Sequence, residues 1–172
     1  MNSLKVKDIT LIALMVAVIE VSKLSLSSIP NVELVSFWII IFSLYFDKKV
    51  YYVIAVFVLL EGMLYGVHVW WIMYLYGWPL LAFLTIKLKN SSMMTFVVLS
   101  GVFGLLFGLL CSLPYFFIGL SQGSLMNGIQ TAFAWWVAGI PFDMLHGISN
   151  IIVMIVLYYP IKRVMDKYIV KI

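Results

Sequence analysis

Long apolar runs separated by short basic hinges dominate this chain and restrict it to structures that cross a lipid bilayer. Its 172 residues are 65% hydrophobic and only 10% charged, whereas soluble domains carry about 25% charged residues. The basic residues recur in hinges, at Lys5 and Lys7, Lys48 and Lys49, Lys87 and Lys89, and Lys162, Arg163, Lys167 and Lys171. Because basic residues are retained on the cytoplasmic side, this spacing predicts about six crossings with both ends in the cytoplasm.

We therefore expect an all-α integral membrane protein, a six-transmembrane-helix bundle that forms a single membrane domain over residues 1–172. A spanning helix needs about 20 mostly apolar residues. The predicted spans are about 9–26, 34–46, 50–66, 70–87, 93–112 and 131–159. Proline and glycine predict a long outer connection over 113–130 and an interruption of the last span near Pro141.

Several classes of function find no support in the sequence. The net charge of +4 comes largely from the basic hinges, and we interpret it as topology and contact with anionic lipid, not as a nucleic-acid surface. Cys111 is the only cysteine, so no intramolecular disulfide can form, and we expect it in the core. The sequence has no HExxH and no cysteine–histidine cluster, so we predict no metal site. Ser149 follows His146 by three residues, which does not by itself make an activated nucleophile, so we predict no catalytic residue.

Seven polar residues lie inside the predicted spans or at their outer ends, where each needs a partner or a cavity. They are Glu20, Lys23, Glu61, His68, Asp143, His146 and Asn150. Glu20 and Lys23 are spaced to neutralise each other on one helix face. Glu61 either lines a cavity or pairs with Lys23. Asp143, His146 and Asn150 form a stripe that serves either as a ligand surface or as a helix-packing network.

Aromatic residues gather at the predicted outer side of the membrane. Trp70, Trp71, Tyr74, Tyr76 and Trp78 lie at the outer end of the third and fourth spans, and Trp135 and Trp136 at that of the sixth. An interfacial belt of indoles explains part of this pattern. A pocket for a flat heterocyclic ligand, which stacks on aromatic rings, explains it equally well.

Three segments resemble a known family. Ala13 and Ala17 form an AxxxA pattern on the first span, residues 28–34 read SIPNVEL, and residues 135–150 read WWVAGIPFDMLHGISN. With its six spans and its size, the whole chain resembles the substrate-binding S components of energy-coupling factor (ECF) transporters, which import micronutrients into bacteria and archaea. The last two segments are similar to one vitamin-type subgroup.

The resemblance implies a multi-pass subunit of a prokaryotic cell membrane that binds a vitamin-like molecule near its outer face. It implies docking onto a transmembrane T component and two cytoplasmic ATPase subunits, with Ala13 and Ala17 in the contact, followed by toppling of the subunit in the membrane. The sequence has no GxxxxGK[ST] phosphate loop, which agrees with ATP being used by the partner subunits.

The expected ligand contacts come from the polar and aromatic residues themselves. They are Asn31, Glu33, Glu61, Trp71, Tyr74, Trp78, Trp136, Asp143, His146 and Asn150. The excess of acidic groups favours a neutral or cationic ligand, although Lys23 could anchor a carboxylate, and cobalamin-type, pyridoxine-type and queuosine-type substrates stay open. Two other classes of function stay open as well: a small membrane scaffold without a ligand, and an intramembrane enzyme.

Overall fold

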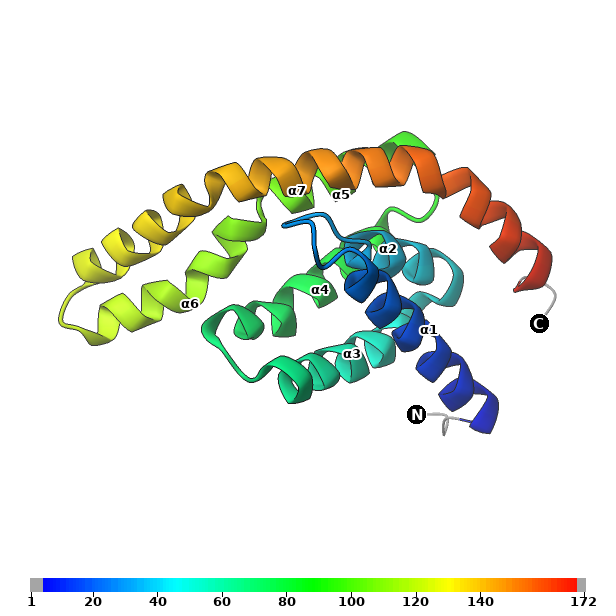
Figure 1. Cartoon of the computed structure of the whole chain (residues 1–172), viewed down its shortest axis with the longest axis horizontal. Helices are drawn as coiled ribbons and strands as arrows, with labels where there is room; N and C mark the ends of the chain where they lie inside the picture. The colour runs from blue at the N-terminus through cyan, green and yellow to red at the C-terminus, as the bar shows by residue number, and fades with distance from the viewer. Residues whose placement is uncertain (1–4, 170–172) are drawn as a thin grey trace.

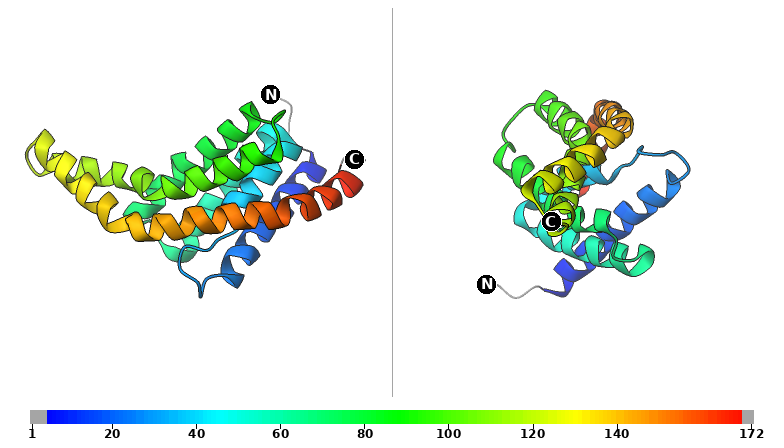
Figure 2. Two further views of the ribbon diagram at one scale, coloured as in Figure 1. Left: turned by 90° about the horizontal axis from the view of Figure 1, so that it is seen from above. Right: turned by 90° about the vertical axis from the view of Figure 1, so that its left-hand side faces the viewer.

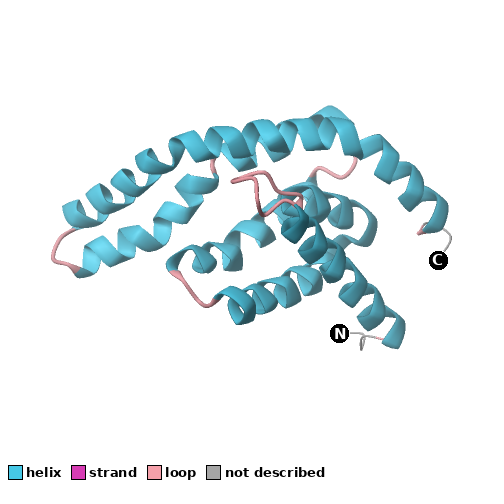
Figure 3. Cartoon of the chain, viewed as in Figure 1, coloured by secondary structure: helices cyan, strands magenta, loops and turns pink. Residues whose placement is uncertain are grey.

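The computed structural model describes residues 5–169, which fold into seven α-helices and one 3₁₀ helix with no strand among them. The elements are α1 (Val6–Ser25), α2 (Val35–Phe46), η1 (Asp47–Lys49), α3 (Val50–Tyr65), α4 (Val69–Lys87), α5 (Met93–Leu105), α6 (Phe107–Ser121) and α7 (Leu125–Tyr168). The connections are short, and the longest of them, residues 26–34, joins α1 to α2 (Figure 3).

Three helical segments of the described residues are long and apolar enough to cross a membrane. They are Val69–Lys87, Met93–Ser121 and Leu125–Tyr168. The helices α2 and α3 have 12 and 16 residues, fewer than the roughly 20 that a full span needs. The helix α1 is long enough but carries Asp8, Glu20 and Lys23. The helical architecture is therefore that of a membrane protein.

The helix α7 runs along most of the length of the molecule and organises the other helices (Figures 1 and 2). Its first half forms an antiparallel hairpin with α6, and its second half packs along α5. The remaining helices lie on one side of α7, and the hairpin of α6 and α7 extends beyond them (Figure 1).

The predicted outer connection over 113–130 is wrong. Only residues 122–124 separate α6 from α7, and α7 continues through Pro141 without interruption. The glycines that suggested a loop instead allow two helices to touch. A Cβ atom on Gly119 would lie 2.5 Å from the carbonyl oxygen of Asn127, and one on Gly128 would lie 2.9 Å from that of Phe116. Small residues of this kind let helix backbones pack closely in membranes.

Ion pairs tie together the end of the bundle at which α1 begins and α2 ends. Lys49 Nζ lies 2.6 Å from Asp8 Oδ1, and Lys89 Nζ lies 3.3 Å from Asp47 Oδ2. The Tyr45 hydroxyl donates to Asp166 near the end of α7. Lys49, Lys89 and Asp47 are about half exposed and Asp8 is 20% exposed, so solvent screens these pairs and they contribute little to stability. These contacts show that the hinges at Lys49 and Lys89 and the end of α7 lie at the same end of the molecule.

The helix α2 lies at the centre of the core. Its residues 35–37 and 39–43 are all buried, and Ile39, Ile40 and Ile41 have no exposed surface. The neighbouring helices therefore cover this part of α2 on every side. Because α2 is fixed in this way, the segment that precedes it, residues 26–34, is held close to the neighbouring helices α4, α6 and α7.

Candidate functional site

A cavity of about 310 Å³ lies beneath the 26–34 loop, at the end of α1 and α2 remote from the ion pairs. The loop supplies one wall, and helices α1, α4, α6 and α7 supply the rest. The lining residues that matter for the argument are Lys23, Asn31, Glu33, Tyr74, Trp78, Phe107 and His146. Residues far apart in the sequence therefore converge on a single, partly open cavity.

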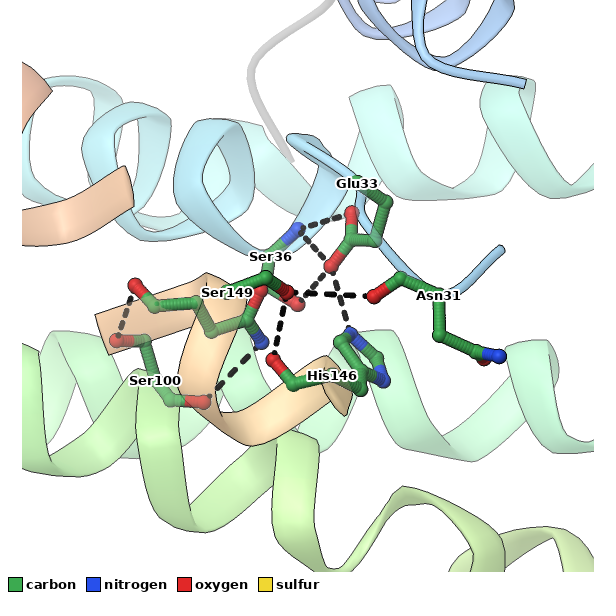
Figure 4. Close-up of polar contacts among 7 residues, drawn as sticks. Asn31, Glu33, Ser36, Ser100, His146 and Ser149 are labelled. Carbon is green, nitrogen blue, oxygen red and sulfur yellow. Dashed lines mark hydrogen bonds and ion pairs between the residues drawn. The ribbon is translucent and has the colours of Figure 1, made fainter. Parts of the chain in front are cut away.

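Two polar contacts fasten the loop to α7 (Figure 4). Glu33 Oε1 lies 2.9 Å from His146 Nε2, and the Ser149 hydroxyl lies 3.2 Å from the carbonyl oxygen of Asn31. Asn31 has a φ of 57°, in the left-handed region that asparagine adopts more readily than most residues. The sharp turn at Asn31 brings both its carbonyl and Glu33 towards α7.

Glu33 also closes the start of α2. Its Oε2 accepts from the backbone N–H of Ser36 at 3.0 Å, and its Oε1 accepts from the Ser36 hydroxyl at 2.6 Å. Burial raises the pKa of Glu33, but the hydrogen bonds from His146 and Ser36 outweigh it and hold the pKa below its usual range. The carboxylate is therefore ionised at neutral pH and can only accept, which assigns the proton of the shared contact to His146 Nε2.

Aromatic rings form a continuous wall from α3 to α7. The ring centroids are 6.0 Å apart for Phe57 and Tyr74, 5.4 Å for Tyr74 and Trp78, and 5.7 Å for Trp78 and Phe107. The Phe107 and His146 rings follow at 4.7 Å. Spacings of 4.5–7 Å with tilted or offset rings are typical of favourable aromatic packing. The wall gives the cavity a rigid apolar side.

A buried ion pair stands beside the cavity. The ammonium group of Lys23 contacts Glu61 Oε2, and its Nζ lies 4.4 Å from the centroid of the Tyr65 ring. Glu61 has no exposed side-chain surface, whereas Lys23 is 25% exposed and lines the cavity. Both carboxylate oxygens of Glu20 lack a hydrogen-bond partner among residues 5–169. Of the two pairings open at the sequence level, the structure has Lys23 with Glu61.

The predicted contact residues divide into two sets. Asn31, Glu33, Tyr74, Trp78 and His146 line the cavity. The other set lies elsewhere. Glu61 is buried and contacts Lys23, which lines the cavity. The Trp71 indole donates to the carbonyl oxygen of Val58 at 2.8 Å. Trp136 packs against Phe133 on the extended hairpin, with ring centroids 6.2 Å apart.

The stripe on α7 also divides. Asp143 Oδ1 accepts from the backbone N–H of Gly108 at 2.8 Å, and Asn150 Nδ2 donates to the carbonyl oxygen of Ser100 at 3.2 Å. Both residues thus join α7 to its neighbours α6 and α5. His146 alone of the three lines the cavity, so the stripe is partly a packing network and partly a wall of the cavity.

The remaining polar and aromatic residues singled out in the sequence contact one another or neighbouring helices. The His68 and Trp70 rings lie 6.0 Å apart, the Tyr76 hydroxyl donates to the carbonyl oxygen of Leu110 at 2.6 Å, and Trp135 stacks on Tyr115 at 3.8 Å. Phe107 is a cavity residue that sequence reasoning missed. It stands in an unbroken apolar run, so nothing in the pattern distinguishes it from a core residue.

Ser149 lies beside the cavity residue His146. The Ser149 hydroxyl points to the backbone carbonyls of His146 and Asn31, at 2.9 and 3.2 Å, while the His146 ring bonds to Glu33. This geometry does not activate a serine nucleophile, which needs a base within hydrogen-bond reach. Within residues 5–169, no group of three or more His, Cys, Asp or Glu side chains could hold a metal ion. Comparison with protein-family models, with curated proteins and with solved structures finds no match.

Proposed function

We propose that this chain is the membrane-embedded substrate-binding subunit of an ECF-type ABC importer in a prokaryotic cell membrane. The observation that carries the proposal is the cavity beneath the 26–34 loop, which gathers aromatic and polar side chains from four helices. A largely apolar cavity with a few convergent polar groups is the usual form of a small-molecule site. A vitamin or related micronutrient is the proposed class of substrate.

The orientation of the chain supports capture from outside. The basic hinges at Lys49 and Lys89 share one end of the bundle through Asp8 and Asp47, and the Tyr45 hydroxyl joins Asp166, the partner of Lys162, to the same end. Under the positive-inside rule we assign that end to the cytoplasm. The cavity lies at the other end of α1 and α2. A six-span arrangement with both termini in the cytoplasm therefore presents the cavity to the outer face.

The surface of α1 supports docking to a partner in the membrane. Ile12, Met15, Val16 and Ile19 face the core, whereas Ala13 and Ala17 are exposed. Two exposed alanines one turn apart leave a shallow groove into which another helix can pack closely. We propose that the T component occupies this groove.

The proposed cycle uses the described residues for binding only. The ligand enters beside the aromatic wall, and the contacts of Glu33 with His146 and of Asn31 with Ser149 hold the loop over it. The loaded subunit then docks through α1 and topples to release its ligand on the cytoplasmic side. The two partner ATPase subunits supply the energy by using ATP.

Copurification tests this proposal. The tagged chain is expressed in its native host, and the ATPase subunits recovered with it are quantified. Ala13→Trp and Ala17→Trp insert a large ring into the groove, so we expect at least a tenfold loss of recovered ATPase, which corresponds to about 1.4 kcal/mol of binding free energy.

Val18→Trp is the matched control. Val18 is 38% exposed on the same helix, about 100° around the axis from Ala17, so its substitution should leave the recovery unchanged. Equal recovery of the ATPase subunits with Ala13→Trp, Ala17→Trp and the unmodified chain would refute docking through this face.

A further inference from the structure

A second cavity lies among the basic hinges, at the opposite end of the bundle from the cavity beneath the 26–34 loop. Its volume is about 330 Å³, and it lies between the C-terminal ends of α2 and α7 and the turn that joins α4 to α5. This cavity, here called the basic pocket, has as its main polar lining Lys89, Asn90, Ser91, Tyr158, Lys162 and Asp166. The site described above uses none of these side chains.

The two lysines of the basic pocket have donors to spare. Lys89 Nζ lies 3.3 Å from Asp47 Oδ2, and both side chains are about half exposed. Lys162 Nζ lies 2.7 Å from Asp166 Oδ2, with both side chains a little less exposed. An ammonium group has three donor hydrogens, so each lysine can donate to a ligand while it keeps its carboxylate partner.

Uncharged groups of the basic pocket add further donors. The side-chain hydrogen bonds of Tyr45, Lys89 and Lys162 within residues 5–169 go to carboxylates or to a backbone carbonyl. The Asn90 amide and the Ser91 and Tyr158 hydroxyls, which also line the pocket, take part in none of these bonds. A ligand with several acceptor oxygens can therefore bond to the α4–α5 turn and to α7 at the same time.

The charge around the basic pocket favours an anion. The acidic residues at this end of the bundle each pair with one lysine: Asp8 with Lys49, Asp47 with Lys89, and Asp166 with Lys162. Other basic residues beside these pairs have no carboxylate partner within residues 5–169, namely Lys48, Lys87, Arg163 and Lys167. Because the pairs cancel, these cations leave a surplus of positive charge, which attracts an anion.

An apolar groove starts at the same α4–α5 turn. Leu88 and Ser92 flank residues 89–91 of the basic pocket, and both line a cavity of about 510 Å³ that follows α5. Its other lining residues are Met94, Thr95, Val98, Leu99 and Val102. From Ser92 to Val102 the helix rises about 15 Å, which is half of the roughly 30 Å hydrocarbon core of a bilayer. The groove therefore has the length of the apolar layer of one leaflet.

We propose that the basic pocket binds the phosphate group of an anionic phospholipid of the cytoplasmic leaflet, and that one acyl chain of this lipid lies in the groove along α5. Basic pockets between membrane helices on the cytoplasmic side are suited to anionic headgroups. Lys89 and Lys162 donate to the phosphate oxygens, and the uncharged donors complete the contact. The lipid is a partner in addition to the ligand and the subunits of the proposed importer.

Native mass spectrometry of the detergent-purified chain tests the proposal with three probes. Phosphatidylglycerol has a phosphate, a net negative charge and acyl chains. Phosphatidylcholine with the same acyl chains has no net charge, and glycerol phosphate has the phosphate without acyl chains. We expect phosphatidylglycerol to bind at least tenfold more tightly than either of the other two.

Variants that remove two positive charges locate the binding. Lys89→Gln with Lys162→Gln should weaken phosphatidylglycerol binding about 30-fold, which corresponds to about 1 kcal/mol for each lysine. Lys48→Gln with Lys167→Gln is the matched control, since it removes the same charge at the same end from outside the lining. These two lysines act only through a field that salt screens, so the control should weaken binding less than threefold.

Two single substitutions keep the test decisive if the variant at Lys89 and Lys162 does not fold. Ser91→Glu leaves both ion pairs in place and adds a negative charge to the basic pocket, so phosphatidylglycerol affinity should fall at least tenfold. Val98→Trp fills the groove with a large ring, so it should weaken phosphatidylglycerol binding at least threefold and leave glycerol phosphate binding unchanged.

Equal affinity for phosphatidylglycerol and phosphatidylcholine would overturn the proposal, because the pocket would then not select an anionic headgroup. Equal affinity for glycerol phosphate would overturn the assignment to a lipid and indicate a soluble phosphate compound. Equal losses in the variant at Lys89 and Lys162 and in its matched control would overturn the assignment to this pocket. Each of these results leaves the proposed function standing, because docking and ligand capture use other surfaces.

Discussion

The buried ion pair of Lys23 and Glu61 gives the sharpest prediction for stability. Glu61 is completely buried and Lys23 is 25% exposed, so Lys23→Met removes the one cation that the described chain brings into contact with the Glu61 carboxylate. Breaking a buried pair from one side costs about 3–5 kcal/mol, and the partial exposure of Lys23 places this case near the lower value. For a chain of this length, about 3 kcal/mol corresponds to a fall in Tm of about 6–12 °C.

The double variant Lys23→Met with Glu61→Met distinguishes the loss of the ion pair from the loss of side-chain packing. Replacement of both partners by apolar groups of similar volume is often neutral or stabilising, so the double variant should recover most of the lost Tm. Thermal unfolding of the chain in nanodiscs, followed by tryptophan fluorescence, measures all of these variants.

A pair on the surface provides the control. Lys89 and Asp47 are about half exposed, so Lys89→Met should cost less than about 1 kcal/mol. If the double variant at Lys23 and Glu61 unfolds at a temperature as low as Lys23→Met does, the stabilising role of the ion pair is refuted.

Three further predictions follow from close contacts and from the loop. Gly104→Ala should lower Tm, because its Cβ would lie 2.8 Å from the backbone of Gly147. Gly139→Ala should leave Tm unchanged, because no atom lies within 4 Å of its Cβ. Equal Tm values for the two variants would contradict the close packing of α5 against α7. The pKa of Glu33 is lower in the folded chain than in the unfolded chain, so ionised Glu33 stabilises the fold. This stabilisation is fully present above the unfolded carboxyl pKa of about 4.3 and is lost as the pH falls through the pKa of Glu33 in the folded chain. The Tm difference between wild type and Glu33→Gln should therefore stay constant from pH 7 to pH 5 and shrink only below that range; a decline already at pH 6 would count against it. Trp71→Phe should lower Tm through one lost hydrogen bond of about 0.5–1.5 kcal/mol, and an unchanged Tm would show that this bond is not stabilising.

Charge and hydropathy were sufficient to predict helices and most of their ends. Asp47, Lys48 and Lys49 mark the turn between α2 and α3, and Lys87 marks the end of α4. The hairpin of α6 and α7 was not predicted, because Gly119 and Gly128 have the composition of a loop. Their role depends on the partner helix, since each glycine leaves room for a carbonyl group of the facing backbone, and no local pattern contains that information.

The sequence singles out several residues that line the cavity, but it does not distinguish them from neighbours of the same type that do not. Glu33 and His146 were identified as costly or well-placed polar groups, and they meet in the structure. Trp71 and Trp78 looked equivalent in the sequence, yet only Trp78 lines the cavity. The difference arises because α3 lies close enough to bond the Trp71 indole. The rotation of a helix about its axis is set by such neighbours, and the sequence of the helix alone does not specify it.

The composition of the complex formed in native membranes tests the central claim most directly. The tagged, unmodified chain is extracted from its host in mild detergent, and its assemblies are weighed by native mass spectrometry. The proposed function predicts one copy of this chain with one T component and two ATPase subunits. A chain that is found only alone, or only with partners that lack nucleotide-binding subunits, would contradict its assignment as the substrate-binding subunit of an ECF-type importer.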